Sequence, residues 1–372
     1  MPEDSKQLIQ HLLHQMLEKN ASDLFLVAGS KASLRIGKEI IPIGEEALMP
    51  QKLAEIAQTI MQPDQLAALH KTRESNFAIS LPGLARFRVN AFFQRDSIGF
   101  VLRRIETHVP SLESLHLPPI LQDFIMAPRG LVLVVGATGS GKSTALASMI
   151  DYRNHHMSGH ILTIEDPIEF VHRHQKSVVS QREVGVDTES YATALKNALR
   201  QAPDVILIGE IRSADTMEAA LSFAETGHLC LSTLHSANTV QAIERIINFF
   251  PSERRDQLYM DLALNLRAIV ALRLIPKKDG HGRIPATEIL INTPTVEGHL
   301  FQGEVEALRD LVGRSVQSGM HTFDQSIYDL FNQGAIGYED ALRYADAPND
   351  LRLKLKLEGS GPQSDKPNFD IL

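Results

Sequence analysis

The sequence predicts an α/β protein of two domains, on the basis of three observations. Four short apolar runs, at 131–135, 161–164, 205–208 and 229–233, are separated mostly by helical segments. These runs are continuously apolar rather than alternating, which is typical of a sheet buried on both faces. A stretch rich in β-forming and turn residues precedes them, and 372 residues are enough for two hydrophobic cores.

The N-terminal part is expected to form a small α+β domain over residues 1–106. Its last three strands are predicted to pair as an antiparallel meander. In chain order, the expected elements are a helix over 5–19, strands over 22–27 and 33–36, two helices over 50–71 broken at Pro63, and strands over 77–81, 85–94 and 98–105. Three prolines mark 107–119 as a linker, so the second domain is expected over 120–345.

The chain after Pro251 is expected to be mostly helical. Apolar residues at helical spacing form one stripe there, namely Leu258, Leu262, Leu266, Ile269 and Leu272. Residues 346–372 are expected to form a C-terminal extension. Its last part, 359–372, mixes Gly, Ser, Pro, Lys and Asp, a composition typical of a mobile tail.

Composition excludes several classes of protein. The formal net charge of −8 argues against a general nucleic-acid-binding protein, because phosphate binding requires a surplus of basic residues. The one cysteine, Cys230, cannot form an internal disulfide and fits a reducing compartment. The N-terminus resembles neither a signal nor a transit peptide, and no apolar run approaches the ~18 residues of a membrane span. We therefore expect a cytoplasmic protein without direct membrane insertion, which reaches a membrane only through a partner.

A phosphate-binding loop is predicted directly after the run 131–135. Its residues are Gly136, Ala137, Thr138, Gly139, Ser140, Gly141, Lys142, Ser143 and Thr144. This is the pattern GxxxxGKS between a strand and a helix, the context that identifies a Walker A motif. Backbone N–H groups and the helix N-terminus would hold the phosphates of ATP. Lys142 is expected to reach the β- and γ-phosphates, and Ser143 to ligate Mg²⁺.

Acidic residues follow two of the other buried runs. Glu210 comes after the run 205–208 in the position of a Walker B carboxylate, although Gly209 stands where many P-loop enzymes carry Asp. Glu210 is expected to hold Mg²⁺ through water. Glu165 and Glu169 follow the run 161–164, and the carboxyl ends of parallel strands meet at one edge, so these acids should converge on the loop. One of them should activate or position water, and the residues alone leave the choice between Glu165 and Glu169 open.

Two histidines, His228 and His235, stand at opposite ends of the run that contains Cys230. A strand of this length separates them by ~20 Å, too far to share a metal ion. His235 lies at the carboxyl end, on the ligand side, where it could sense the γ-phosphate. The remaining histidines are expected on the surface, among them His155, His156, His172 and His174.

Five motifs in this order resemble the secretion ATPase superfamily, in particular the type IV pilus retraction ATPases of the PilT/PilU family. The similarity spans roughly residues 20 to 345, and two N-terminal segments, 21–24 and 86–90, also match. The motifs are GATGSGKST over 136–144, ILTIEDPIEF over 161–170, QREV over 181–184, DVILIGE over 204–210 and TGHLCLSTLHS over 226–236.

The resemblance implies a PAS-like N-terminal domain joined to a RecA-like ATPase domain with a helical C-terminal region, assembled as a ring-shaped homohexamer. It implies that Glu169 is the catalytic carboxylate. It also implies that Arg88 and Arg103, with Arg104 as a further candidate, reach the phosphates from the N-terminal domain. Such cations stabilise transition-state charge when the interface closes. His228 is a candidate nucleotide-binding residue because it belongs to the last motif.

At several positions the sequence departs from the usual family pattern, and these differences resemble the PilU branch of the family more than the PilT branch. Residues 295–299 replace a segment that is rich in Ala, Ile and Arg in PilT. Phe25 stands where the family often has His, and Ala137 where Pro is frequent. The chain also extends past the core with 351–357. Extension and type II secretion ATPases usually carry a four-cysteine zinc insertion, which one cysteine cannot supply.

The resemblance therefore implies a hexameric, ATP-hydrolysing motor that promotes pilus retraction and twitching motility. We expect it to be accessory to a sister retraction ATPase, and to work at the inner-membrane platform protein of the pilus machine. The alternative is a nucleotide-binding regulator or adaptor that depends on a partner ATPase for force. A DNA translocase would need a basic central pore, which the acidic balance disfavours.

Overall fold

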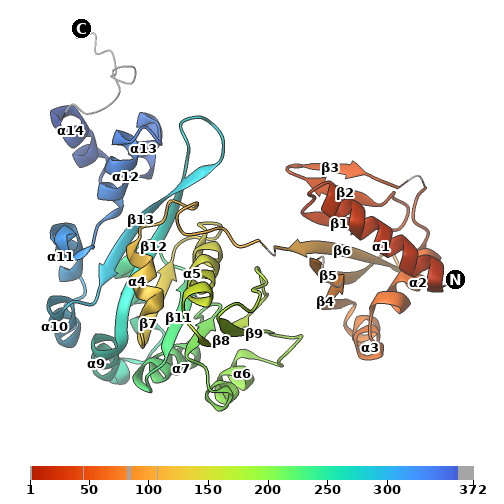
Figure 1. Ribbon diagram of the computed structural model, residues 1–372, viewed down its shortest axis with the longest axis horizontal. Coiled ribbons are helices and arrows are strands. Elements are labelled where there is room, and N and C mark those ends of the chain that lie inside the picture. Colours follow the sequence, from red (N-terminus) through yellow and green to blue (C-terminus); the bar gives the residue numbers. More distant parts are fainter. Residues whose placement is uncertain (1, 45, 82–84, 107, 359–372) are drawn as a thin grey trace, which may run out of the picture. The chain divides into compact units, whose positions relative to one another are not determined.

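The computed structural model describes residues 2–44, 46–81, 85–106 and 108–358, which form two compact units (Figure 1). The N-terminal unit runs to His108 and includes two later segments, Ile168–Val171 and Gly185–Glu189. The C-terminal unit contains the remaining described residues. The sequence analysis placed both later segments in the second domain. The tail predicted over 359–372 lies outside the described residues.

The N-terminal unit is a six-stranded antiparallel sheet with three helices. Its elements are α1 (Pro2–Glu18), β1 (Asp23–Leu26), β2 (Ser33–Ile36), β3 (Glu39–Pro42), α2 (Pro50–Ile60), α3 (Pro63–Thr72), β4 (Glu74–Leu81), β5 (Ala85–Gln94) and β6 (Ser97–Ile105). The strand order is β3-β2-β1-β6-β5-β4. Pro50 and Pro63 occupy the first turns of their helices, where the missing N–H costs nothing.

The sequence analysis missed only one strand of this sheet, β3. All four of its residues are exposed, and it lies at the edge of the sheet. A short exposed edge strand has neither an apolar run nor an alternating pattern, so the sequence carries no periodic signal for it.

The C-terminal unit contains a seven-stranded sheet and eleven α-helices within the described residues. Up to the last sheet strand, its elements are α4 (Ile120–Met126), β7 (Gly130–Val135), α5 (Lys142–His156), β8 (Gly159–Glu165), β9 (Ser177–Glu183), α6 (Tyr191–Ala198), β10 (Val205–Ile208), α7 (Ala214–Glu225), β11 (Leu229–Leu234), α8 (Thr239–Asn248), α9 (Arg255–Asn265), β12 (Leu266–Pro276) and β13 (Arg283–Ile291). The strand order is β13-β12-β7-β11-β10-β8-β9, and every pairing is parallel except that of β12 with β13.

Alternate residues of the central strands enter two different cores. Leu131 and Leu133 of β7 pack with α6, α7, α8 and α9, whereas Val132 and Val134 pack with α4 and α5. The sheet is therefore covered by helices on both faces, as Figure 1 shows. The α/β class predicted from the continuously apolar runs is confirmed.

The helical stripe predicted through Leu266, Ile269 and Leu272 is wrong beyond Asn265, where α9 ends. Residues 266–276 form β12, which lies between β7 and β13. Nearly every residue from 266 to 272 is apolar and buried. The apolar residues therefore fit the spacing of a helix and that of a strand equally well. Periodicity does not separate a helix from a buried strand in such a run. Strand β9 was also missed, because its residues Ser177–Glu183 are largely polar.

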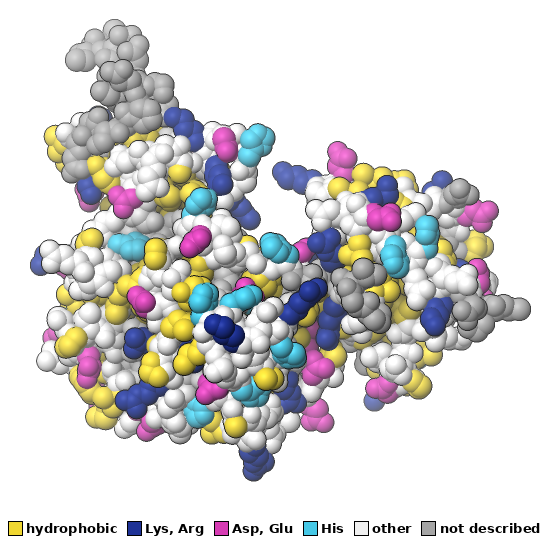
Figure 2. Space-filling model, in the orientation of Figure 1, with side chains coloured by type: hydrophobic (Ala, Val, Ile, Leu, Met, Phe, Trp, Pro, Cys, Tyr) yellow, Lys and Arg dark blue, Asp and Glu magenta, His cyan; other side chains and the backbone are white. Residues whose placement is uncertain are grey.

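The C-terminal helices pack on the same core as α7 and α9. They are α10 (Pro294–Gln302), α11 (Ala307–Arg314), α12 (Phe323–Asn332), α13 (Tyr338–Tyr344) and α14 (Pro348–Glu358). None of the helices in the described residues has the length and apolar character needed to cross a membrane. On the face drawn in Figure 2, Lys and Arg side chains are interspersed with Asp and Glu.

Candidate nucleotide-binding site

The predicted phosphate loop lies between β7 and α5, at the carboxyl edge of the parallel strands. Gly136, Gly139 and Gly141 have φ angles of 152°, 74° and 93°, which favour glycine. A Cβ atom at Gly136 would lie 2.4 Å from the Ser140 Oγ and 2.6 Å from the Leu272 carbonyl oxygen. Only glycine therefore allows the chain to close into this loop.

The polar groups of the loop fit an anion. The Ser140 hydroxyl is buried and has no hydrogen-bond partner, so it remains available to a ligand. The Lys142 ammonium is buried and donates to the carbonyl oxygens of Gly136 and Ala137, at 2.9 Å each. Ser143 and Thr144 follow in the first turn of α5, half-buried. Ala137, Thr138 and Gly139 are exposed at the tip of the loop.

A hollow of about 420 Å³ adjoins the loop. The segment Ser114–Leu117, part of the predicted linker, forms one wall, and β12 and β13 form another. Leucine and proline side chains line it together with Lys277 and Arg283. A lining of apolar side chains with two cations suits a flat heterocycle that continues into phosphates.

The carboxylates of Glu165 and Glu210 stand at the ends of two strands near the loop, since β8, β10, β11 and β7 are adjacent in the sheet. Glu165 ends β8, and its Oε1 accepts hydrogen bonds from Thr163 Oγ1 at 2.6 Å and from Gln181 Nε2 at 3.3 Å. Glu210 follows β10 and is half-buried. These two predicted acids therefore lie at the same sheet edge as the loop.

His235 follows β11, between the loop and Glu210 in the order of the strands. Its Nε2 lies 3.2 Å from Glu210 Oε1. Burial, and then the charge of Lys142, lowers the pKa of His235, while Glu210 acts in the opposite direction. The neutral imidazole, with one donor and one acceptor nitrogen, is therefore the favoured form at neutral pH.

His228 is not brought to the loop. It precedes β11, at the opposite end from His235, and its carbonyl oxygen accepts from the N–H of Gly130 at the start of β7. The length of β11 places it ~20 Å from the loop. Its Nδ1 lies 3.1 Å from Thr226 Oγ1, a local contact at the end of α7.

Glu169 belongs to the N-terminal unit, with the segment Ile168–Val171, and is exposed. Glu165, four residues earlier, belongs to the C-terminal unit. The two acids between which the sequence left a choice are thus carried by different compact units.

Three arginines of the N-terminal unit form a row with Asp23 across its sheet. Arg88 of β5 is directly opposite Arg103 of β6, which is opposite Asp23 of β1, and Asp23 is opposite Arg35 of β2. The buried Asp23 carboxylate pairs with Arg103 at 2.8 Å and lies 3.8 Å from Arg35. Like charges placed directly opposite each other are unfavourable, and the Asp23 carboxylate on the other side of Arg103 offsets part of the repulsion between Arg103 and Arg88.

Arg104 lies on the other face of that sheet, because successive strand residues alternate. It is opposite the fully buried Phe87. Its guanidinium donates to Asn20 Oδ1 at 2.9 Å and to Glu106 Oε2 at 3.1 Å. The structure therefore groups Arg88 with Arg103 and separates Arg104 from both.

Sequence reasoning missed Arg212, which clamps Glu210. Its Nε and Nη2 both lie 2.8 Å from Glu210 Oε2. The only signal in the sequence is an arginine two residues after the Walker B acid. Thr163, which holds Glu165, had a clearer signal, a polar residue inside an apolar run.

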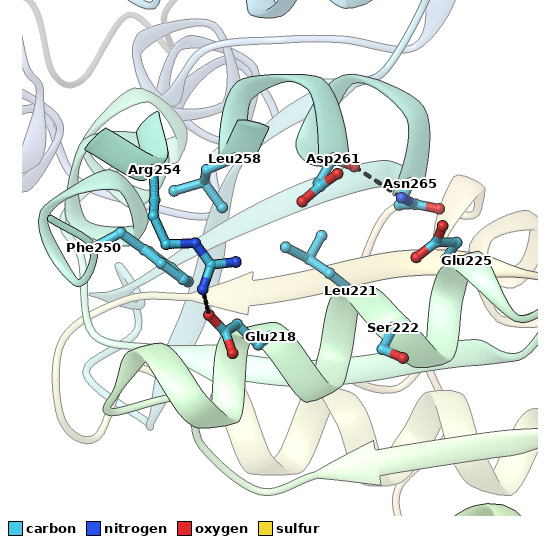
Figure 3. Close-up of a pocket in the computed structure, with 9 residues that line it drawn as sticks. All are labelled: Glu218, Leu221, Ser222, Glu225, Phe250, Arg254, Leu258, Asp261 and Asn265. Carbon is cyan, nitrogen blue, oxygen red and sulfur yellow. Dashed lines mark hydrogen bonds and ion pairs between the residues drawn. The ribbon is translucent and has the colours of Figure 1, made fainter. Parts of the chain in front are cut away.

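A second hollow, of about 170 Å³, lies between α7 and α9 (Figure 3). Arg254 Nη1 donates to Glu218 Oε1 at 2.5 Å across one end, and Leu221 and Leu258 line its interior. It shares no residue with the phosphate loop or its acids. Within the described part of the chain, no group of three or more His, Cys, Asp or Glu side chains is arranged to hold a metal ion.

The chain is similar to known proteins over most of its length. A family described as type II/IV secretion system protein matches residues 3–305. The chain is 53% identical over 363 residues to the type IV pilus ATPase PilU of Pseudomonas aeruginosa, covering 98% of this chain and 94% of that protein. It is 39% identical to the type IV pilus retraction ATPase PilT of the same organism, covering 92% of this chain and 99% of that one.

Solved structures also resemble the chain over nearly its whole length. The pilus retraction motor PilT with bound ADP has a TM-score of 0.84 and 38% identity, covering 92% of this chain and 98% of that one. The ATPase DotB of Legionella pneumophila has a TM-score of 0.80 and 29% identity, covering 95% and 96%.

Proposed function

Because the chain belongs to the type II/IV secretion system protein family, and is a type IV pilus retraction ATPase nearer to PilU than to PilT, we propose that it works as a homohexameric accessory motor. Its partners would be a sister retraction ATPase and the inner-membrane platform protein of the pilus machine. The protein would be cytoplasmic and would associate with the inner membrane through that machine. The loop with its unpartnered Ser140 hydroxyl is the observation that most directly supports nucleotide binding.

We assign the N-terminal unit as the PAS-like domain and the C-terminal unit as the RecA-like ATPase domain. The boundaries that we propose are 1–106 and 120–345, joined by 107–119 and followed by an extension from 346. The antiparallel sheet of the first unit and the mainly parallel sheet of the second support this assignment.

The P-loop would bind ATP through its backbone N–H groups, Ser140 and Lys142. Ser143, and Glu210 through water, would hold Mg²⁺. The ion, when bound, neutralises charge on the phosphates. Lys142 must exchange its bonds to the carbonyls of Gly136 and Ala137 for phosphate oxygens. His235, whose Nε2 lies 3.2 Å from Glu210 Oε1, would sense the γ-phosphate.

Hydrolysis requires a base for water and cations for the developing charge. We assign the base to Glu169, with Glu165 held by Thr163 and Gln181 as a fixed neighbour. Arg88 and Arg103 would supply the cations. Glu169, Arg88 and Arg103 all belong to the N-terminal unit, whereas the loop belongs to the C-terminal unit. The reaction would therefore depend on closing one unit on the other, which couples hydrolysis to movement.

The test is the steady-state ATPase rate of the purified full-length protein. We expect Lys142→Ala to abolish ADP binding and turnover, and Glu169→Gln to keep ADP binding while lowering kcat at least a hundredfold, as for the loss of a general base. The matched controls are Lys196→Ala and Glu244→Gln, which alter exposed helical residues.

A wild-type protein that binds ADP without hydrolysing ATP would support the adaptor function instead. So would a rate that neither Lys142→Ala nor Glu169→Gln changes. In cells, deletion of the sister ATPase should abolish twitching even when this protein is present, because the proposed role is accessory.

A further inference from the structure

The carboxyl end of β10 holds a polar group that the sequence does not reveal. A Cβ atom at Gly209 would lie 2.9 Å from the hydroxyl oxygen of Tyr191, closer than Cβ atoms come to other heavy atoms. The same point is 3.3 Å from the Cα of Glu165. The space that a side chain at position 209 would enter is therefore taken by the Tyr191 hydroxyl, beside the acid that ends β8.

Tyr191 reaches this point from α6, of which it is the first residue. The N-cap Ser190, whose hydroxyl accepts from the Thr193 N–H at 3.1 Å, fixes where the helix begins. The Tyr191 ring is half-buried against the C-terminal core. Because the core holds the apolar ring in place, the hydroxyl at the strand ends is a hydrogen-bond donor with a fixed position.

The surroundings of the hydroxyl are acidic. Burial, and then the charges of Asp166 and Glu165, raise the pKa of Tyr191, so the phenol stays protonated at neutral pH. A protonated phenol donates one hydrogen bond and carries no charge. An aspartate at position 209 would add a further negative charge to Glu165, Asp166 and Glu210, and like charges in one site favour protonation of a carboxyl group. The hydroxyl supplies a polar group there without that penalty.

We propose that Tyr191 is a positioning residue for ATP hydrolysis, and that its hydroxyl takes the place of the missing side chain at position 209. It donates a hydrogen bond at the ends of β8 and β10 and so acts with Thr163 and Gln181 to hold the carboxylate of Glu165 beside the proposed base. This inference rests on the proposed ATP hydrolysis and adds a residue from α6 to that site.

The test is Tyr191→Phe in the full-length protein, which keeps the packed ring and removes only the hydroxyl. We expect kcat to fall about tenfold, the scale of one lost orienting hydrogen bond, with KM for ATP within about twofold of wild type. The melting temperature and the affinity for a fluorescent ADP analogue should not change. A loss confined to kcat separates positioning from a structural role.

The matched control is Tyr338→Phe, which removes a hydroxyl from a half-buried ring that packs edge-on against Phe331 in the C-terminal helices. Its kinetics should equal those of wild type. An unchanged kcat for Tyr191→Phe overturns the inference while the ATPase function stands. A fall in kcat that comes with a lower melting temperature or weaker ADP binding overturns it as well, because the role would then be structural. An inactive wild type would overturn the proposed function itself.

Discussion

His172 is buried, with 8% of its surface exposed, although the sequence analysis expected it on the surface. Its backbone N–H donates to Gln181 Oε1 at 2.8 Å, and Gln181 in turn donates to Glu165. Its ring Nδ1 is buried without a hydrogen-bond partner. Burial lowers the pKa of His172 from 6.5 to about 4, so the ring is neutral in the folded protein at neutral pH.

His172 should therefore make the protein less stable in acid. Between pH 6.5 and 4 the unfolded chain binds a proton that the folded chain does not, so stability rises with pH across this window. From pH 7 to pH 5 the loss is about 2 kcal/mol. His172→Gln should reduce the fall in melting temperature between these pH values, and the exposed His281→Gln should not. An equal fall in all three proteins would contradict this role.

At the residue scale, sequence analysis predicted those site residues that belong to one continuous motif. The loop over 136–144 needs only its own glycines, Lys142 and the flanking strand and helix, and all are adjacent in the chain. Tyr191, Arg212 and the burial of His172 were not predicted. Tyr191 and His172 depend on contacts between segments brought together only by the sheet. A single residue in such a contact leaves no periodic pattern.

Helix α5, which begins at Lys142, is fixed to α4 by a buried arginine near its other end. Arg153 is 4% exposed, and its Nη1 donates to the carbonyl oxygens of Ile125 at 2.6 Å and Ala127 at 3.0 Å. These carbonyls belong to the end of α4, where a helix leaves its last acceptors unsatisfied. Burial lowers the pKa of Arg153, which stays charged at neutral pH.

Arg153→Leu should therefore destabilise the C-terminal unit. The leucine keeps an apolar volume but leaves two buried carbonyl groups without donors, at a cost of roughly 2 to 4 kcal/mol. The midpoint of urea unfolding should fall, whereas Arg200→Leu, at an exposed position, should change stability by less than about 0.5 kcal/mol. Equal midpoints for the two variants would show that these hydrogen bonds contribute nothing to the stability of the C-terminal unit.

At the element scale, predictions succeeded where length or pattern was unambiguous. The strands at 33–36 and 205–208 have the bounds that the sequence predicted. The error at β12 arose because an 11-residue run of mainly apolar residues is long enough for a helix. What decides its conformation is the open edge of β7 on one side and β13 on the other, which the local sequence does not encode.

At the scale of the whole molecule, the predicted catalytic groups are divided between two units. The loop, Glu165 and Glu210 belong to the C-terminal unit, and Glu169, Arg88 and Arg103 to the N-terminal unit. The order of the motifs predicted an α/β protein with a nucleotide site. It did not predict that Ile168–Val171, inside the second domain by sequence, belongs to the first unit. That assignment depends on packing with residues far away in the chain.

Arg88→Ala tests this division. Since the phosphate loop is in the other unit, ADP affinity should stay within about twofold of wild type, while kcat falls at least tenfold through loss of a cation at the transition state. Arg88→Lys should recover only part of the rate, because an ammonium lacks the planar fork of guanidinium. The control is Lys71→Ala, on an exposed position of α3. A normal kcat for Arg88→Ala would remove this arginine from the site.

The chain passes between the two units at five places, after residues 108, 167, 171, 184 and 189. Cutting the chain after residue 108 would release residues 1–108 as a separate chain, while the segments 168–171 and 185–189 of the same unit would stay covalently attached to the C-terminal unit. The crossing after Pro167 also sets a mechanical limit. The Cα atoms of Glu165 and Glu169, four residues apart, cannot separate by more than about 14 Å even when the chain is fully extended. The Cα atom of Glu169, in the first unit, therefore stays within about 14 Å of the residue that ends β8, in the second unit.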